Sequence, residues 1–119
     1  MMAANQEDSM RQEQAEAWVG DAVLGLYVRE LILREDSCLD GAKFSRFTSN
    51  SLLSDIGNPT AVEAEIGRVY KTGGIAAGFE HIETRILPVM LRREKAFQNS
   101  LRQRNEAKQK KTKRTRWSR

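Results

Sequence analysis

The stretch from residue 16 to residue 30, EAWVGDAVLGLYVRE, decides the fold. Around it, from about Gln12 to Leu33, apolar residues recur at intervals of three and four, which is the period of an amphipathic α-helix with a wide apolar face. Gly20 and Gly25 lie inside this helix, and each costs about 1 kcal/mol relative to alanine in an exposed helix. We therefore expect another helix or a ligand to approach closely at these glycines.

The rest of the chain also has helical periodicity. A second helix is predicted over residues 44–57 and a third over 59–71, with Asn58 as the N-cap of the third. Gly73-Gly74 ends the third helix, and a fourth follows in which Pro88 should cause a kink or a break. No strand-like alternation is visible, so we predict an all-α chain.

Basic residues are concentrated at the C-terminus. Residues 102–119 contain nine Lys or Arg against Glu106 alone, which leaves eleven basic and fifteen acidic residues, a net charge of −4, in the rest of the chain. A length of 119 residues suffices for one domain. We predict a flexible N-terminus over residues 1–10, a helical domain over 11–100 and a basic, disordered tail over 101–119.

The sequence favours a cytoplasmic protein with no membrane partner. Cys38 is the only cysteine, so no intrachain disulfide can form and a reducing compartment fits. The first residues carry acids and lack the apolar run of a secretory signal. No stretch approaches the ~20 apolar residues that span a bilayer.

Two carboxylates are the candidates for chemistry, because no Ser-His-Asp arrangement, cysteine pair, phosphate loop or His-Glu-x-x-His motif occurs. Asp21 lies in an apolar, glycine-flanked stretch, where a carboxylate must be paired, hydrogen-bonded or bound to a cation. Glu63 lies in the first turns of the third helix, where acids also complement the helix dipole. Each residue alone, like the sole histidine His81, is more commonly a surface or helix-packing residue.

Three segments, in this order, resemble the ribonuclease III family. Residues 18–24, WVGDAVL, resemble the end of the family's signature helix, and residues 48–53, TSNSLL, are similar to its Ser-Asn helix. Residues 62–70, VEAEIGRVY, followed by Gly73-Gly74, resemble its second acidic helix and double glycine. The resemblance covers about residues 16–86 and looks most like the compact Mini-III branch, which lacks a double-stranded-RNA-binding domain.

The resemblance implies a minimal four- to five-helix bundle of the ribonuclease III type that forms a homodimer through the signature helix. It implies a Mg²⁺-dependent endoribonuclease, with Mn²⁺ as a substitute, that cleaves double-stranded or structured RNA such as ribosomal RNA precursors. Asp21 and Glu63 would be the catalytic, metal-binding residues, and Mg²⁺ often uses one or two carboxylates plus substrate phosphate. The family's other two carboxylate positions carry Ala17 and Thr60 here. The residues expected to assist are Glu16, Asn50, Thr60 and Glu65.

The basic tail is expected to bind RNA phosphates in place of the missing binding domain. The residues expected to contact RNA are Lys108, Lys110, Lys111, Lys113, Arg114, Arg116 and Trp117, the last by stacking on a base. A solvated tail that only aids solubility is the alternative. For the whole chain, the alternatives are a catalytically inactive RNA-binding or ribosome-associated protein of this fold, and a helical protein-interaction module with a nonspecific basic tail.

Overall fold

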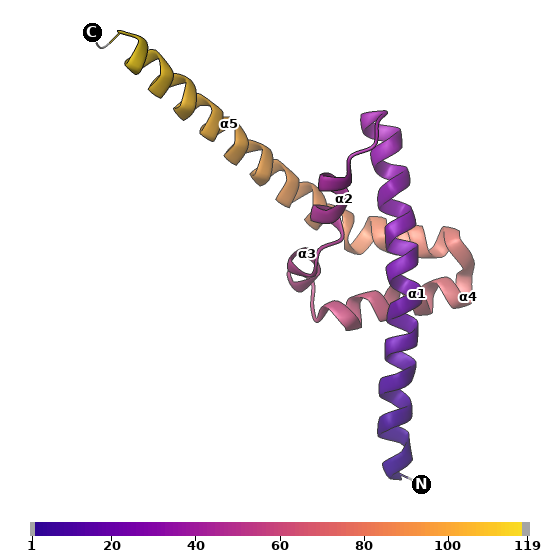
Figure 1. The fold of residues 1–119 in the computed structure, drawn as a ribbon. Helices are drawn as coiled ribbons and strands as arrows, with labels where there is room; N and C mark the ends of the chain where they lie inside the picture. The colour runs from indigo at the N-terminus through magenta and orange to yellow at the C-terminus, as the bar shows by residue number, and fades with distance from the viewer. Residues whose placement is uncertain (1, 118–119) are drawn as a thin grey trace.

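The chain is all-α, as predicted (Figure 1). The computed structural model describes the backbone of residues 2–117 and the side chains of residues 6–112, and it contains no strand in that part of the chain. The helices are α1 (Met2–Asp36), α2 (Gly41–Phe47), α3 (Asn50–Ser54), α4 (Pro59–Arg85) and α5 (Leu87–Trp117). Of the helices described, none is long and apolar enough to cross a membrane.

The helix α4 is a hairpin of two limbs that meet at Gly74. Gly74 has φ 81° and ψ −173°, a conformation outside the helical region. Glycine adopts positive φ without the steric penalty of a Cβ, so the predicted helix end at this glycine pair is confirmed. Asn58 caps the first limb by accepting a hydrogen bond from the Ala61 N–H at 3.1 Å, and Pro59 occupies the first turn, both as predicted.

The core forms where α1 lies across both limbs of α4 (Figure 1). Tyr27 of α1 meets Phe79 of the second limb edge to face, with ring centroids 5.2 Å apart. Trp18, Ala22 and Leu26, on the other side of α1, are exposed. The largest fully buried side chains are Leu24, Val28, Leu52, Leu53, Ile66, Ile82, Ile86 and Met90.

The single helix predicted over residues 44–57 is wrong, because two short helices occupy this region. The hydroxyl of Thr48 donates to the Phe44 carbonyl at 2.8 Å and closes α2. Ser49 then caps α3, accepting from the Leu52 N–H at 3.1 Å. Serine and threonine side chains that bond the backbone in this way compete with helix continuation, which explains the break.

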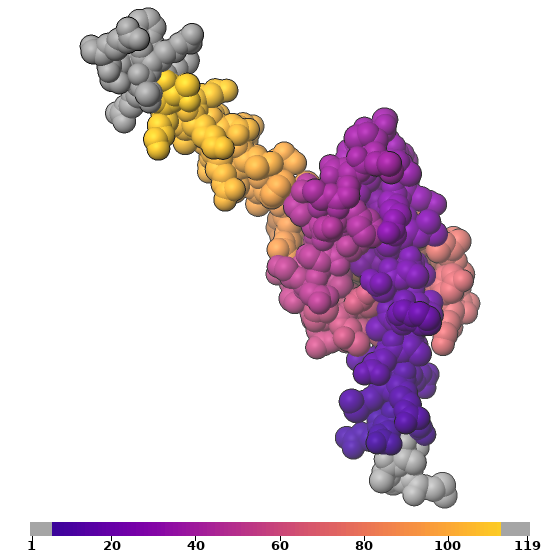
Figure 2. All heavy atoms as spheres, in the orientation of Figure 1, coloured from indigo at the N-terminus to yellow at the C-terminus, as the bar shows by residue number. Residues whose placement is uncertain are grey.

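The helix α5 extends away from the other helices (Figures 1 and 2). It begins just after Ile86, with Pro88 in its first turn, where the missing N–H of proline leaves no helical bond unmade. The predicted break at this proline is confirmed. The helix continues to Trp117, although the sequence predicts disorder from residue 101, because Lys, Arg, Gln and Ala are good helix formers. Likewise α1 begins at Met2, inside the segment 1–10 predicted to be flexible.

Candidate functional site

Two glycines let α1 and the first limb of α4 cross at backbone contact. A Cβ on Gly20 would overlap the carbonyl oxygen of Glu63, and a Cβ on Gly67 would overlap the carbonyl oxygen of Glu16. The contacts are therefore reciprocal: Gly20 meets Glu63, which lies four residues before Gly67, and Gly67 meets Glu16, which lies four residues before Gly20. The close approach predicted at Gly20 is confirmed, whereas a Cβ on Gly25 would meet the side chains of Arg29 and Phe44 at 3.0 and 3.8 Å.

On one side of this crossing lie Asp21 and Glu63. Asp21 is exposed and Glu63 is half-buried. The pKa of Glu63 is raised from 4.5 to about 7, first because burial disfavours its charged form, then because its side chain hydrogen-bonds to Asp21 and is repelled by the charge of Asp21. The structure thus brings together the two carboxylates that the sequence singled out, close enough for their side chains to hydrogen-bond.

On the other side of the crossing lies an oppositely charged pair. Glu16 is buried, with its side chain 7% exposed, and its Oε1 lies 3.7 Å from Nη1 of Arg68, whose side chain is 52% exposed. Arg68 follows Gly67 as Asp21 follows Gly20. The two sides of one crossing therefore differ in charge, since one pair contains a guanidinium and the other contains two acids. Glu16 forms an ion pair of its own here, rather than a group with the two acids.

The other residues expected to assist lie at different places. Thr60 is exposed one turn before Glu63, so it lies beside that residue on the surface of α4. Glu65 is half-buried, and its Oε1 lies 3.9 Å from Nε2 of His81, so it links the two limbs of the hairpin. Asn50 begins α3, and its carbonyl accepts a hydrogen bond from the Ser54 hydroxyl at 2.7 Å. His81 has the helix-packing role expected for it.

Among the residues with described side chains, no group of three or more His, Cys, Asp or Glu is placed to hold a metal ion. The candidate centre is therefore a pair of carboxylates. Carboxylate oxygens are the ligands that hard cations such as Mg²⁺ prefer, and Mg²⁺ retains several waters of its own. The pair fits such a cation, because Glu63 and Asp21 are both acids and the charge of each disfavours the charged form of the other until a cation balances them.

The residues expected to bind RNA lie on α5, away from this crossing. Lys108, Lys110 and Lys111 are exposed on the projecting part of the helix. The side chains of Lys113, Arg114, Arg116 and Trp117 lie outside the described residues. The structure therefore brings Asp21 and Glu63 together, and of the basic residues of α5 with described side chains it brings none to this pair within one chain.

Sequence reasoning missed Arg68 and the role of Gly67, although a signal exists. Residues 16–20 read EAWVG and residues 63–67 read EAEIG, so the same Glu-Ala-x-aliphatic-Gly pattern occurs on both helices that cross. The glycine lies four residues after the glutamate in each, which is the spacing that a reciprocal contact needs. The residue that follows is Asp21 in the first pattern and Arg68 in the second.

Comparisons of the chain with models of protein families, with curated proteins and with solved structures found no match. The resemblance to ribonuclease III therefore depends on the quoted motifs alone.

Proposed function

We propose that this protein is a Mg²⁺-dependent endoribonuclease of the ribonuclease III type that cleaves double-stranded or structured RNA as a homodimer. The observation that carries the proposal is the pairing of Asp21 with Glu63 where α1 crosses α4. These are the two acids that the resemblance to ribonuclease III implies for the metal site.

The charge difference across the crossing supports a cation at this pair. On the opposite side, the buried acid Glu16 is balanced by Arg68 at 3.7 Å. On the candidate side, Glu63 faces a second acid, and burial together with Asp21 raises its pKa to about 7. A divalent cation held by Asp21 and Glu63 would stabilise both carboxylates in their charged forms.

The exposure of Asp21 leaves room for a substrate phosphate beside such a cation. A bound Mg²⁺, or Mn²⁺ in its place, would supply a Lewis acid for a scissile phosphate and lower the pKa of a coordinated water. The residues of the chain then have two tasks. Asp21 and Glu63 would hold the cation, and the glycine contacts at the crossing fix the separation between the two helices that carry them.

The homodimer is supported by a row of apolar side chains on α1 that remain exposed in one chain. Trp18 is 81% exposed and Leu26 is 42% exposed, and Ala22 lies between them at helical spacing. Leu33 extends the same surface and is 49% exposed. A two-fold contact between these surfaces buries them in both copies and sets one carboxylate pair on each side of the interface. The resemblance implies this arrangement.

The test is a cleavage assay on a labelled RNA duplex with Mg²⁺ and, separately, with Mn²⁺. Wild type should cut the duplex, and Asp21→Asn and Glu63→Gln should reduce cutting by about ten- to a hundredfold, because each removes one of two charged ligands. Glu80→Gln, an exposed acid on the second limb of α4, is the matched control and should cut like wild type. A wild type that cuts no duplex with either metal overturns the proposal.

One observation favours a second candidate function. The family's other two acidic positions carry Ala17 and Thr60, and the described residues contain no third ligand for a metal. A chain that retained this fold without the activity would be an RNA-binding or ribosome-associated protein. It would bind duplex RNA equally well with EDTA, with Mg²⁺ and as Asp21→Asn, and it would never cut.

A further inference from the structure

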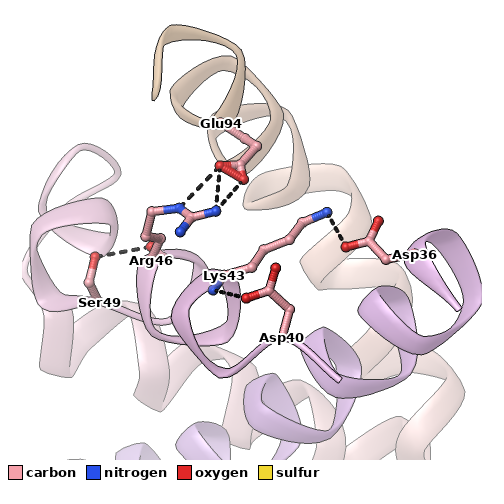
Figure 3. Close-up of polar contacts among 6 residues, drawn as sticks. All are labelled: Asp36, Asp40, Lys43, Arg46, Ser49 and Glu94. Atoms are coloured by element: carbon pink, nitrogen blue, oxygen red, sulfur yellow. Dashed lines mark hydrogen bonds and ion pairs between the residues drawn. The ribbon is translucent and has the colours of Figure 1, made fainter. Parts of the chain in front are cut away.

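The first turns of α5 are held by an arginine from α2. The guanidinium of Arg46 donates three hydrogen bonds to Glu94, at 2.9, 3.0 and 3.1 Å, which makes a bidentate ion pair (Figure 3). The side chain of Glu94 is 13% exposed and that of Arg46 is 29% exposed, so the pair is largely shielded from water. Shielded bidentate pairs are the strongest and most directional of the ion pairs between side chains.

Three more contacts hold nearby positions of α5. The guanidinium carbon of Arg46 lies 3.9 Å from the centre of the Phe97 ring, one turn beyond Glu94. From the other side, Arg93 donates to the Ser51 hydroxyl of α3 at 2.9 Å and lies 3.5 Å from the Asp55 carboxylate. The contacts of Arg46 and Arg93, together called the α5 clamp below, therefore tie Arg93, Glu94 and Phe97 to α2, to α3 and to the residue that caps α3.

Beyond the α5 clamp, α5 continues as a solvent-exposed, basic helix. Residues 98–112 are exposed apart from Asn99, which is half-buried, and the helix projects away from the other elements (Figures 1 and 2). At 1.5 Å per residue, the helix from residue 98 to residue 117 is about 30 Å long. Its basic residues with described side chains are Arg102, Arg104, Lys108, Lys110 and Lys111, against one acid, Glu106.

The charge distribution along the chain favours RNA phosphates as the partner of this helix. The chain before residue 102 has a net charge of −4, so it repels a polyphosphate, and yet the proposed cleavage site lies within it. Attraction for RNA must then come from the basic part of α5. An arm that is held in one direction binds more tightly than a loose tether of equal charge, because less ordering is needed on binding.

Building on the proposed function, we propose that the α5 clamp points α5 along duplex RNA, so that the helix is a stiff phosphate-binding arm and not a loose basic tail. Arg46, Glu94 and Arg93 are then positioning residues, which act through the arm without contacting RNA. The exposed cations of the arm contact the phosphates.

The test separates the effect of the protein's net charge on RNA affinity from the effect of the direction in which α5 is held. Arg46→Glu lowers the net charge by two and Glu94→Arg raises it by two, but both disrupt the clamp. The affinity for a fluorescent RNA duplex, measured by anisotropy in EDTA, should fall about five- to tenfold in both variants, and the double variant with the two residues exchanged should recover to within about twofold. Asp36→Arg is the matched control, because it makes the same charge change as Glu94→Arg at the neighbouring ion pair with Lys43 (Figure 3). It should bind as well as wild type or better.

A loose tail gives the opposite result, since Glu94→Arg then binds as tightly as wild type or more tightly, and this outcome overturns the proposal. Glu94→Gln, which keeps the shape of the side chain, covers the case in which Glu94→Arg does not fold by circular dichroism, and it should bind more weakly than wild type. Arg104→Gln combined with Lys108→Gln and Lys110→Gln should make the slope of log affinity against log salt shallower, by about 0.9 for each phosphate that the arm no longer neutralises. Binding is measured without metal, so the two proposals can fail separately. If wild type binds duplex RNA but never cuts it, only the proposed nuclease activity is refuted. If wild type binds no duplex RNA, the proposed role of α5 as a phosphate-binding arm is refuted.

Discussion

Replacing Glu63 with Gln should remove the loss of stability that wild type shows as the pH rises through about 7. In the metal-free protein the pKa of Glu63 is raised from 4.5 to about 7, through burial first and then through Asp21. The folded chain therefore binds more protons than the unfolded chain between these two values. Stability from this group is complete below about pH 4.5 and is lost as the pH rises through 7.

The size of the loss follows from the same shift. At about 1.4 kcal/mol per pKa unit, a rise from 4.5 to about 7 has an upper limit of about 3 kcal/mol. Because Glu63 is only half-buried and Asp21 is exposed, solvent screening reduces the expected loss to about 1–2 kcal/mol. Glutamine has the same shape, carries no charge and still donates to Asp21. Glu63→Gln should therefore be more stable than wild type by this amount near pH 8 and not near pH 4.

The measurement is urea unfolding followed by far-ultraviolet circular dichroism at several pH values in EDTA. Adding Mg²⁺ at about a hundred times its dissociation constant should stabilise wild type near pH 8 by about 2.7 kcal/mol and leave Glu63→Gln almost unchanged. Glu80→Gln, with its exposed side chain on the same helix, should follow wild type in every condition. If wild type and Glu63→Gln lose stability in parallel between about pH 5 and pH 8, burial and Asp21 do not raise the pKa of Glu63.

Three further predictions concern the helices. Gly20→Ala should destabilise the fold by at least about 2 kcal/mol in urea unfolding, because its Cβ would overlap the backbone of Glu63; an unchanged midpoint would contradict the close crossing. Leu24→Ala should cost about 2–5 kcal/mol in the same measurement, because Leu24 is fully buried, and a loss below about 1 kcal/mol would argue against that burial. Trp18→Lys should leave the free energy of unfolding of the single chain within about 0.5 kcal/mol of wild type but lower the dimer fraction measured by light scattering. An unchanged dimer fraction would show that the interface does not include this face of α1.

Local signals in the sequence predicted much of the helical arrangement. Asn58 and Gly74 act through their own backbone geometry, so the start of α4 and its turn could be recognised from residue type alone. The sequence did not predict the break between α2 and α3. The break depends on the hydrogen bond that the Thr48 hydroxyl donates to the Phe44 carbonyl, and the same residue types also occur inside helices. The direction of α5 depends on Arg46 and Glu94, which are 48 residues apart, and no local pattern reports it.

The candidate site was predicted in part, for a similar reason. Asp21 and Glu63 were chosen because of their motifs, and the structure brings them together. Arg68 was not chosen, because an arginine on a helix surface is ordinary until its partner Glu16 is known to be buried beside it. The matched EAWVG and EAEIG patterns record the crossing in the sequence, but that record has meaning only once the two helices are known to touch.

The long reach of α5 has a consequence for how the subunit number is measured. The radius of gyration of one chain is 19.8 Å, with extents of 81 × 33 × 20 Å, whereas a compact chain of 119 residues has about 13.5 Å. The observed value is that of a rounded protein of roughly 300 residues. On a sizing column, a single chain should therefore elute where a globular dimer or trimer is expected. Light scattering reports mass independently of shape, so it is the method that distinguishes one copy from two.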